Sequence, residues 1–164
     1  MKQLLTLCIP IQDDQVLLGM KKCGFGAGLW NGFGGKLEPK ETVEEAARRE
    51  LVEEVGIQDG LLQKFGLLEF VYNDTERYLE VHVFRLTEFT DNPLETDEMR
   101  PAWFSYAEIP YSQMWADDEY WLPLLLENKC FTGSFIFKSS ATASRSGEIL
   151  EHRLRVVAQL PTGI

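Results

Sequence analysis

The sequence predicts an α/β fold in which one strongly marked helix interrupts a series of β-strands. The chain has 164 residues, a length that is typical of one domain with one sizeable core. Its hydrophobic content of 45% is ordinary for a globular protein. Apolar segments bounded by turn residues lie on both sides of the helix, which predicts strands. We expect one domain over residues 1–158, a mobile loop at 139–147 and a frayed tail at 159–164.

The expected strands include two hairpins. Asp13 and Asp14 predict the turn of the first hairpin, and the polar residues 73–76 predict the turn of the second. A second helix is expected over Leu122–Asn128. The strands expected in chain order are Leu4–Ile11, Val16–Lys21, Leu61–Tyr72, Tyr78–Glu88, Ala102–Ser105, Phe131–Lys138 and Ile149–Val157.

The central helix is predicted to begin after Thr42 and to end at Gly56. Thr42 and Glu45 have the spacing of a capping box, in which each side chain accepts from the other residue's backbone N–H. Gly56 suits the left-handed conformation that ends many helices. The residues that recur at helical spacing and predict a buried stripe are Val43, Ala46, Ala47, Leu51 and Val55.

The same helix carries Glu50, Glu53 and Glu54 on one face, because residues three and four apart are neighbours on a helix. Their mutual repulsion is offset if a hard divalent cation with oxygen ligands binds there. The alternative is a solvated acidic face with Arg48 and Arg49 alongside. The full pattern favours the cation, because it combines Gly35, Glu41, Arg49-Glu50-Leu51, Glu53-Glu54 and Gly56-Ile57 at fixed spacings.

The overall charge and the cysteines narrow the possible functions. A net charge of −10 disfavours stable binding to nucleic acid, which needs Lys and Arg against the phosphates. No apolar run is long enough to span a membrane, and Leu4–Ile11 is better explained as a first strand than as a signal peptide. Cys8, Cys23 and Cys130 are odd in number and widely spaced, so we expect reduced thiols in the cytoplasm.

Two stretches outside the helix have both a structural and a functional interpretation. The glycine-rich segment 23–28 is either a flexible connector or a loop that approaches a ligand closely. Asp117 and Asp118 lie between two tryptophans, and they either cap the next helix or contact a ligand. Pro123 fits a first helical turn and not an interior, so we expect that helix to begin late or with an irregular turn.

Two single residues are ambiguous when each is taken alone. Glu98 is most simply a surface charge, although it precedes a strand from which a carboxylate can reach a metal site. His82 lies within a strand, where a lone histidine is usually structural.

The pattern from Gly35 to Ile57 matches the Nudix box, so the chain resembles the Nudix hydrolases. The resemblance implies the Nudix fold, an α/β/α sandwich with a mixed, curved β-sheet and a characteristic loop and helix. It also implies cleavage of a nucleoside diphosphate linked to another group, with Mg²⁺ as the cofactor and Mn²⁺ as a substitute. The expected partner is a small nucleotide, bound by a monomer.

Further segments resemble one branch of that family, the animal enzymes that hydrolyse oxidised purine nucleoside triphosphates. These segments are LLGMKK, GFGAG, WNGFGGK, TDEMRP and MWADDEYW, and the resemblance runs from Leu4 to Phe137. It implies that 8-oxo-dGTP, 2-hydroxy-dATP and O6-methyl-dGTP are candidate substrates, cleaved to a nucleoside monophosphate and pyrophosphate, which would sanitise the nucleotide pool and prevent mutation. The alternatives are a Nudix hydrolase of nucleotide sugars, dinucleoside polyphosphates or RNA caps, and a non-catalytic nucleotide-binding module.

The resemblance also implies roles for particular residues. The implied metal ligands are Gly34, through its backbone, with Glu50, Glu53, Glu54 and Glu98. The four glutamates and Arg49 are the implied catalytic residues, and Glu53 and Glu98 are both candidates for the base. The implied substrate-binding residues are Thr6, Lys21, Phe25, Asn31, Gly34, Gly35, Phe70, Leu79, Trp115, Asp117, Asp118 and Trp121. The sequence departs from the family at Cys23, where a basic residue is usual, at Leu79, where the animal enzyme has methionine, and in the Ser-rich segment 139–147.

Two adjacent aspartates facing a purine edge suggest a mode of recognition. Oxidised guanine has an N7–H that a carboxylate accepts, whereas its O6 needs a donor such as a protonated carboxyl group. We expect Asp117 and Asp118 to share one proton when a ligand is bound, because two close carboxylates resist joint ionisation. Moving that proton would let one pocket accept both oxidised guanine and 2-hydroxyadenine. A helix N-terminus nearby opposes this, since it favours the charged forms.

Overall fold

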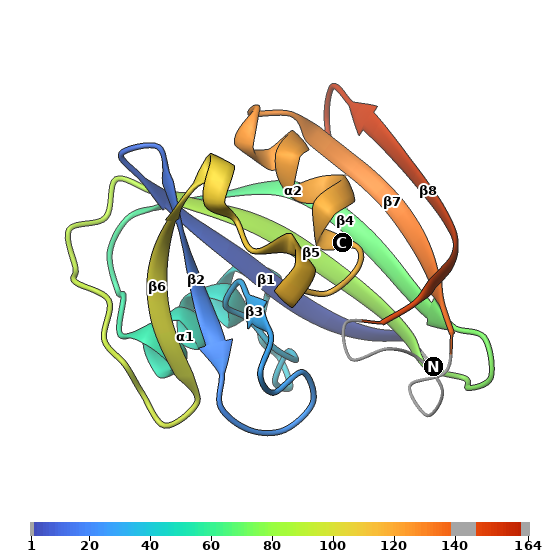
Figure 1. The fold of residues 1–164 in the computed structure, drawn as a ribbon, viewed down its shortest axis with the longest axis horizontal. Coiled ribbons are helices and arrows are strands. Elements are labelled where there is room, and N and C mark those ends of the chain that lie inside the picture. Colours follow the sequence, from blue (N-terminus) through green and yellow to red (C-terminus); the bar gives the residue numbers. More distant parts are fainter. Residues whose placement is uncertain (1, 139–146, 162–164) are drawn as a thin grey trace.

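The computed structural model describes residues 2–138 and 147–161, which form one mixed, curved β-sheet with two α-helices (Figure 1). The sheet has the strand order β3-β2-β1-β5-β4-β7-β8, and β6 pairs with β2 off this path. Short 3₁₀ turns at Tyr106–Glu108 and Tyr111–Gln113 follow β6. The elements in chain order are β1 (Lys2–Gln12), β2 (Gln15–Lys21), β3 (Trp30–Asn31), α1 (Val43–Val55), β4 (Leu61–Tyr72), β5 (Tyr78–Thr87), β6 (Met99–Ser105), α2 (Asp118–Leu126), β7 (Cys130–Phe137) and β8 (Ile149–Val157).

The sheet is mixed because two of its pairings are parallel. β1 runs parallel to β5, with Thr6 opposite His82, and β4 runs parallel to β7. The other strand pairings are antiparallel. The segment that follows β3 also joins β1, through bridges from Phe33 to Cys8 and from Lys36 to Leu5. Backbone hydrogen bonds therefore attach this segment to the centre of the sheet.

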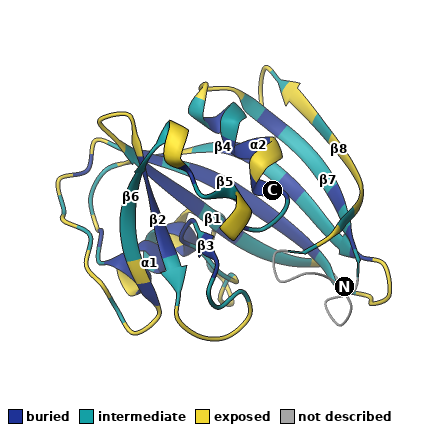
Figure 2. Ribbon diagram, in the orientation of Figure 1, coloured by how far each residue is buried: buried dark blue, intermediate teal, exposed yellow. Residues whose placement is uncertain are grey.

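The two helices cover opposite faces of the sheet. Leu51 of α1 packs in one cluster with Cys8 and Phe84, whereas Trp121 of α2 packs in the other cluster with Val83. Val83 and Phe84 are neighbours in β5, and they belong to different clusters because side chains alternate across a strand. This layering is the expected α/β/α sandwich. Figure 2 shows the buried residues gathered along the central strands and the inner sides of the helices.

Helix α1 has the limits that its local sequence predicts. Thr42 accepts a hydrogen bond from the Glu45 backbone, and the Glu45 carboxylate accepts one from the Thr42 backbone, so the capping box is complete. Gly56 has φ 72° and ψ 20°, the left-handed conformation expected at the end of the helix. The buried residues of the helix include Glu50 and Glu54 as well as its apolar stripe.

The predicted limits of the second helix are wrong. Helix α2 begins at Asp118 and contains Pro123 in its interior. Proline cannot donate to a carbonyl of the preceding turn. The helix nevertheless buries Trp121, Leu122 and Leu125, and burial of each large side chain contributes about 1.5–3 kcal/mol. That gain offsets the one missing hydrogen bond.

Several strand limits also differ from the prediction. β6 begins at Met99 and includes Pro101, because the strand pairs with β2 alone and an edge strand tolerates a residue without N–H. The short strand β3 was not expected. Residues 139–146 of the predicted mobile loop and 162–164 of the predicted tail lie outside the described residues. Neither helix of the described chain has the length and apolar character needed to cross a bilayer.

Candidate active site

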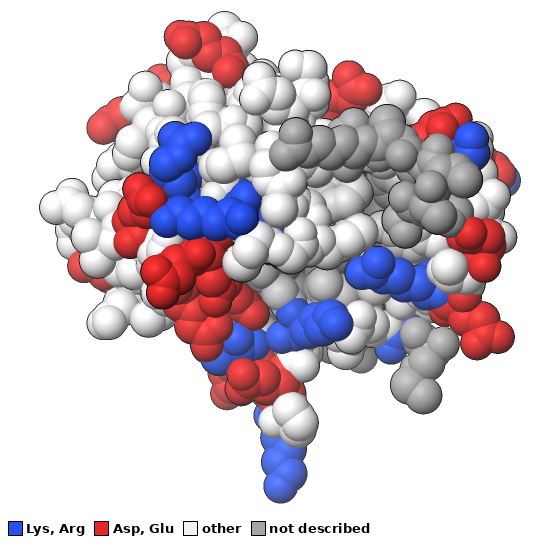
Figure 3. Space-filling model, turned by 60° about the horizontal axis from the view of Figure 1, so that its bottom comes forward, with Lys and Arg blue, Asp and Glu red and all other residues white. Residues whose placement is uncertain are grey.

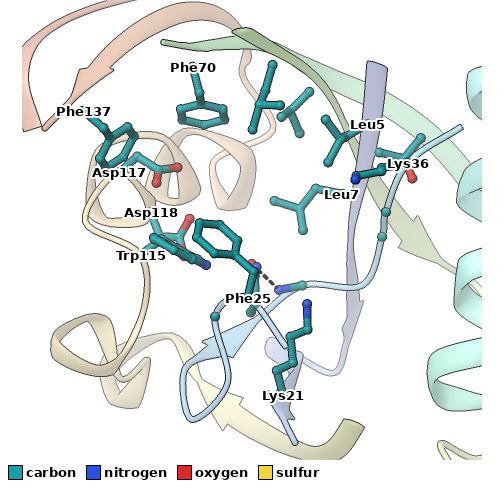
Figure 4. Close-up of a pocket in the computed structure, with 18 of the residues that line it drawn as sticks. Leu5, Leu7, Lys21, Phe25, Lys36, Phe70, Trp115, Asp117, Asp118 and Phe137 are labelled. Atoms are coloured by element: carbon teal, nitrogen blue, oxygen red, sulfur yellow. Dashed lines mark hydrogen bonds between the residues drawn. The ribbon is translucent and has the colours of Figure 1, made fainter. Parts of the chain in front are cut away.

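A cavity of about 430 Å³ opens on the sheet where the glycine-rich segments meet the strand surface. Its walls come from β1, β4, β5, the loop after β2 and the segment before α2 (Figure 4). Nearly all the predicted substrate-binding residues contribute to these walls. They are Thr6, Lys21, Phe25, Asn31, Gly34, Gly35, Phe70, Leu79, Trp115, Asp117 and Asp118.

Asp117, Asp118 and Trp115 gather at one end of this cavity, and Lys36 lies at the other (Figure 4). Trp115 packs against Phe25 with ring centroids 5.0 Å apart. We call the end of the cavity that holds Asp117 and Asp118 the aspartate end. It combines aromatic faces with two buried carboxyl groups, a combination that suits a flat, polar ring.

The two aspartates do not cap helix α2. Asp117 occupies the N-cap position, yet its side chain makes no capping hydrogen bond. Its Oδ2 atom instead accepts a hydrogen bond of 2.7 Å from Nε1–H of Trp121, four residues along the helix. Among the described residues, Oδ2 of Asp118 has no hydrogen-bond partner although it is buried. A buried polar atom without a partner is costly, so this geometry favours ligand contact over capping.

Burial makes these carboxyl groups reluctant to ionise. It raises the pKa of Asp117 to about 6, against the opposing effect of the Trp121 hydrogen bond. Burial also raises the pKa of Asp118 well above its usual range, and the neighbouring charge of Asp117 adds to the effect. The electrostatics therefore favour a pair that retains a proton near neutral pH.

The opposite end of the cavity, which we call the glutamate end, is built on Gly34 and Gly35. The backbone N–H of Gly34 donates to Oε1 of Glu54 at 2.8 Å. A Cβ on Gly34 would lie 1.9 Å from the Thr6 carbonyl oxygen, and one on Gly35 would lie 2.4 Å from Oε1 of Glu50. Only glycine therefore allows the backbone to approach both β1 and the glutamates so closely.

Arg49 holds the carboxylates of the glutamate end in place. Its Nε and Nη2 atoms donate to Glu41 at 2.7 and 2.9 Å, and its Nη1 atom donates to Glu50 at 3.0 Å and to Glu53 at 3.2 Å. Nη2 also donates to the carbonyl of Lys36 at 3.1 Å. The hydrogen bond to Glu41, and next that to Glu50, raise the pKa of Arg49, which remains charged. The arginine thus acts as a positioning residue for the glutamates.

The glutamate end concentrates negative charge. Burial raises the pKa of Glu54 to about 8, against the Gly34 hydrogen bond, and the charges of Glu50 and Glu98 raise it further. Burial also raises the pKa of Glu50. Figure 3 shows one face of the molecule, on which acidic side chains gather in a patch that Lys and Arg side chains border, beside a largely uncharged area. A divalent cation would offset this repulsion.

The donor set fits such a cation by its chemistry. All the predicted side-chain ligands are carboxylates, which hard divalent ions prefer. Among the described residues, no three histidine, cysteine or acidic side chains are already arranged as a coordination sphere. Glu50 and Glu53 turn toward Arg49, and Glu54 accepts from Gly34. Binding of a cation therefore requires these side chains to turn.

Three residues that were considered from the sequence do not line the cavity. Trp121 lies outside the cavity wall, 1% exposed, and contacts the site through its hydrogen bond to Asp117. Glu98 is exposed, and its charge acts on Glu50 and Glu54. His82 is fully buried on the sheet, with Nε2 3.0 Å from a Glu80 carboxylate oxygen, and burial lowers its pKa. The structural interpretation of His82 agrees with this position.

Other wall residues escaped the sequence prediction. Lys36 and Arg77 bring positive charge, and the remainder are mostly apolar. The alternation of β1 offered a signal for Leu5 and Leu7, whereas Arg77 follows a turn and offered none. These additional residues are Leu5, Leu7, Gly26, Gly32, Lys36, Tyr72, Arg77, Val81, Met99 and Phe137.

The chain belongs to the NUDIX family, because the model of the NUDIX domain matches residues 1–125. Nudix hydrolases generally use divalent metal ions. The recognition of a Nudix fold from the sequence is thus confirmed.

Similar proteins extend over almost the whole chain. The oxidized purine nucleoside triphosphate hydrolase of Danio rerio is 49% identical over 158 residues, which are 96% of this chain and 97% of that protein. The protein of the same name from Mus musculus is 45% identical over 155 residues, covering 94% of this chain and 96% of that protein. Among solved structures, the mutator MutT protein from Bacillus halodurans has a TM-score of 0.80 at 27% identity, covering 93% of this chain and 97% of that one.

Proposed function

We propose that this chain hydrolyses oxidised purine nucleoside triphosphates to a nucleoside monophosphate and pyrophosphate. The observation that carries the proposal is one cavity that joins a buried aspartate pair to a helix of glutamates. The names of relatives with 49% and 45% identity support the same substrate class. The candidate substrates are 8-oxo-dGTP, 2-hydroxy-dATP and O6-methyl-dGTP. Their removal would sanitise the nucleotide pool and prevent mutation.

In this proposal the aspartate end recognises the base. An ionised carboxylate of the pair accepts the N7–H of oxidised guanine, and a protonated one donates to O6. Trp121 holds Asp117 in place through its indole N–H, which leaves Asp118 with a buried oxygen available to the base. The side chains of Phe25 and Trp115 supply apolar faces for the ring.

The glutamate end cleaves the phosphate chain. We assign Glu50, Glu53, Glu54 and Glu98, with the backbone of Gly34, as the residues that would hold Mg²⁺, for which Mn²⁺ can substitute. The bound ion would neutralise phosphate charge and lower the pKa of the attacking water. Lys21 and Lys36 line the cavity and attract the triphosphate, while Arg49 orients the glutamates.

The reaction consumes one water molecule. Its oxygen forms a new bond to the α- or the β-phosphorus, and the bond from that same phosphorus to the bridging oxygen breaks, which yields the nucleoside monophosphate and pyrophosphate. Glu53 and Glu98 are the candidates to accept the proton of the water. We further propose that a monomer suffices, because one chain supplies both ends of the cavity. The free thiols of Cys8, Cys23 and Cys130 suit a cytoplasmic location.

The substrate test measures kcat/KM with pyrophosphate detection. The panel contains 8-oxo-dGTP, 2-hydroxy-dATP, O6-methyl-dGTP and dGTP, together with a nucleotide sugar and a dinucleoside polyphosphate. We expect the oxidised purine nucleotides to exceed dGTP by at least about tenfold, the effect of about 1.4 kcal/mol of differential binding. Equal values for dGTP and the modified nucleotides would contradict the proposed specificity.

The catalytic test compares Glu54→Gln with Glu44→Gln. Glu54 is buried beside Gly34, whereas Glu44 is exposed in the first turn of the same helix. We expect Glu54→Gln to bind nucleotide but to lose turnover, and Glu44→Gln to behave as the wild type. If wild type and Glu54→Gln both bind nucleotide without turnover, the chain is a non-catalytic binding module.

A further inference from the structure

Arg77 lies at the rim of the aspartate end, where the turn after β4 leads into β5. Its guanidinium carbon lies 4.6 Å from the ring centroid of Phe25 and 5.3 Å from that of Tyr72. Its backbone is fixed on both sides, since its N–H donates to Oγ1 of Thr75 and its carbonyl accepts from the N–H of Tyr72. The backbone of Arg77 is thus held by hydrogen bonds, and its side chain reaches across the rim to Phe25 in the loop after β2.

Phe25 is the aromatic tip of the glycine-rich loop and is 48% exposed. The glycines around it, Gly24, Gly26 and Gly28, have φ values of 78°, 86° and 84°. Glycine in this region gives a loop little stiffness of its own. Backbone hydrogen bonds close the base of the loop, where Gly28 N–H donates to the Lys21 carbonyl at 2.9 Å, while its tip contacts Trp115 on one side and Arg77 on the other.

The charge of Arg77 is directed at rings rather than at carboxylates. Among the described residues, Arg77 forms none of the ion pairs. A guanidinium over an aromatic face is attracted by the ring quadrupole. Tyr72 in turn stacks on Phe137, with centroids 5.8 Å apart. A continuous chain of contacts therefore runs from Trp115 through Phe25, Arg77 and Tyr72 to Phe137, and every member of it lines the cavity.

We propose that Arg77 is a positioning residue that clamps Phe25 against Trp115 and so preforms the aromatic wall for a purine base. The inference rests on the proposed function, because it takes a nucleotide base as the occupant of the aspartate end. A loop that is ordered before binding pays less entropy when the ligand arrives. The clamp acts on the base and not on the phosphates, since Arg77 stands with the aromatic residues and apart from the glutamates.

The first experiment separates KM from kcat for 8-oxo-dGTP. Arg77→Met keeps an unbranched apolar side chain in place of the aliphatic part of arginine without its charge, and Arg77→Lys keeps the charge. We expect Arg77→Met to raise KM about 5- to 20-fold, with kcat within about twofold of wild type, and Arg77→Lys to restore much of the affinity. The matched control is Arg100→Met, which removes a guanidinium that lies 5.2 Å from the Trp30 ring centroid, outside the cavity wall. It should leave KM unchanged. An equal fall of kcat and kcat/KM in Arg77→Met would overturn the positioning role.

The second experiment tests the clamp without turnover. Amide hydrogen exchange of residues 24–28 in the ligand-free protein should be faster in Arg77→Met than in wild type. In a Phe25→Leu background, Arg77→Met should cause little further change in exchange or KM, because its partner ring is gone. Unchanged exchange in Arg77→Met overturns the clamp. Failure of the proposed function appears separately, as absence of turnover by the wild type on every oxidised purine nucleotide, and the exchange result still decides the role of Arg77.

Discussion

Replacing Trp121 with phenylalanine removes one hydrogen bond from the aspartate end and leaves a small cavity in the core. The indole N–H of Trp121 donates to Oδ2 of Asp117 at 2.7 Å, and both side chains are buried. Phenylalanine keeps an aromatic ring for the stacking on Phe131, where the centroids are 5.8 Å apart. The substitution therefore acts chiefly on the proton affinity of the aspartate pair.

The size of the effect follows from the charge of the acceptor. A hydrogen bond to a charged group contributes about 1.5–3 kcal/mol, and about 1.4 kcal/mol corresponds to one pKa unit. The indole N–H stabilises the carboxylate, so its loss raises the pKa of Asp117 by roughly one to two units. In the wild type that pKa is about 6. The step at which the pair passes from two protons to one thus moves to about pH 7–8 in Trp121→Phe.

The assay is the pH dependence of kcat/KM for 8-oxo-dGTP. If base recognition needs a pair with a single proton, the acidic limb of the profile lies near the pKa of Asp117 and shifts upward in Trp121→Phe. Trp103→Phe is the matched control, because Trp103 stacks on Phe89 and does not line the cavity. An acidic limb that stays in place in a folded Trp121→Phe protein, or that moves to lower pH, would refute the single-proton reasoning.

Three further predictions concern catalysis and stability. Gly35→Ala should lower kcat about 100-fold or more with only a small change in Tm, because its Cβ displaces the movable carboxylate of Glu50; unchanged kcat would contradict this. Thr42→Ala should lower the free energy of unfolding by about 1 kcal/mol and Tm by about 2–4 °C, because it removes the hydroxyl that accepts the hydrogen bond from the Glu45 backbone N–H. Circular dichroism measures the shift. Asp118→Asn should reduce the loss of unfolding free energy that occurs as the pH rises. Burial raises the pKa of Asp118 in the folded protein, so the contribution of this group to the free energy of unfolding is largest below its unfolded pKa and declines by about 1.4 kcal/mol per pH unit above it, until the folded pKa is reached. Thermal unfolding at pH 5 and pH 8 measures this slope, and equal slopes in both proteins would contradict the prediction.

Local signals in the sequence predicted α1 and most strands well. Thr42, Glu45 and Gly56 determine the ends of α1 through contacts within a few residues, so a sequence pattern contains that information. The start of α2 was mispredicted, because the preference of Pro123 is local whereas the burial of Trp121 against the sheet is not. At that position tertiary packing overrides the local preference of proline for the first helical turn.

The candidate site was predicted unevenly for a similar reason. The glutamates belong to one helix with fixed spacing, and the motif therefore reveals them together. Arg77 and Phe25 are more than 50 positions apart, and only the folded sheet brings them into contact. Trp121 lies behind Asp117 and outside the cavity wall, and residue type alone does not distinguish a wall residue from one that supports Asp117.

Strand β1 lies between the two ends of the cavity and fixes the distance between them. Its backbone donates from Thr6 to the carbonyl of Gly35 at 2.9 Å, and the side chains of Leu5 and Leu7 form part of the cavity wall. On its other edge β1 pairs with β5 over a long parallel register. The separation between the aspartate end and the glutamate end is consequently set by main-chain geometry. Side-chain substitutions can alter which base is accepted, while the distance between the base-binding end and the phosphate-cleaving end stays the same.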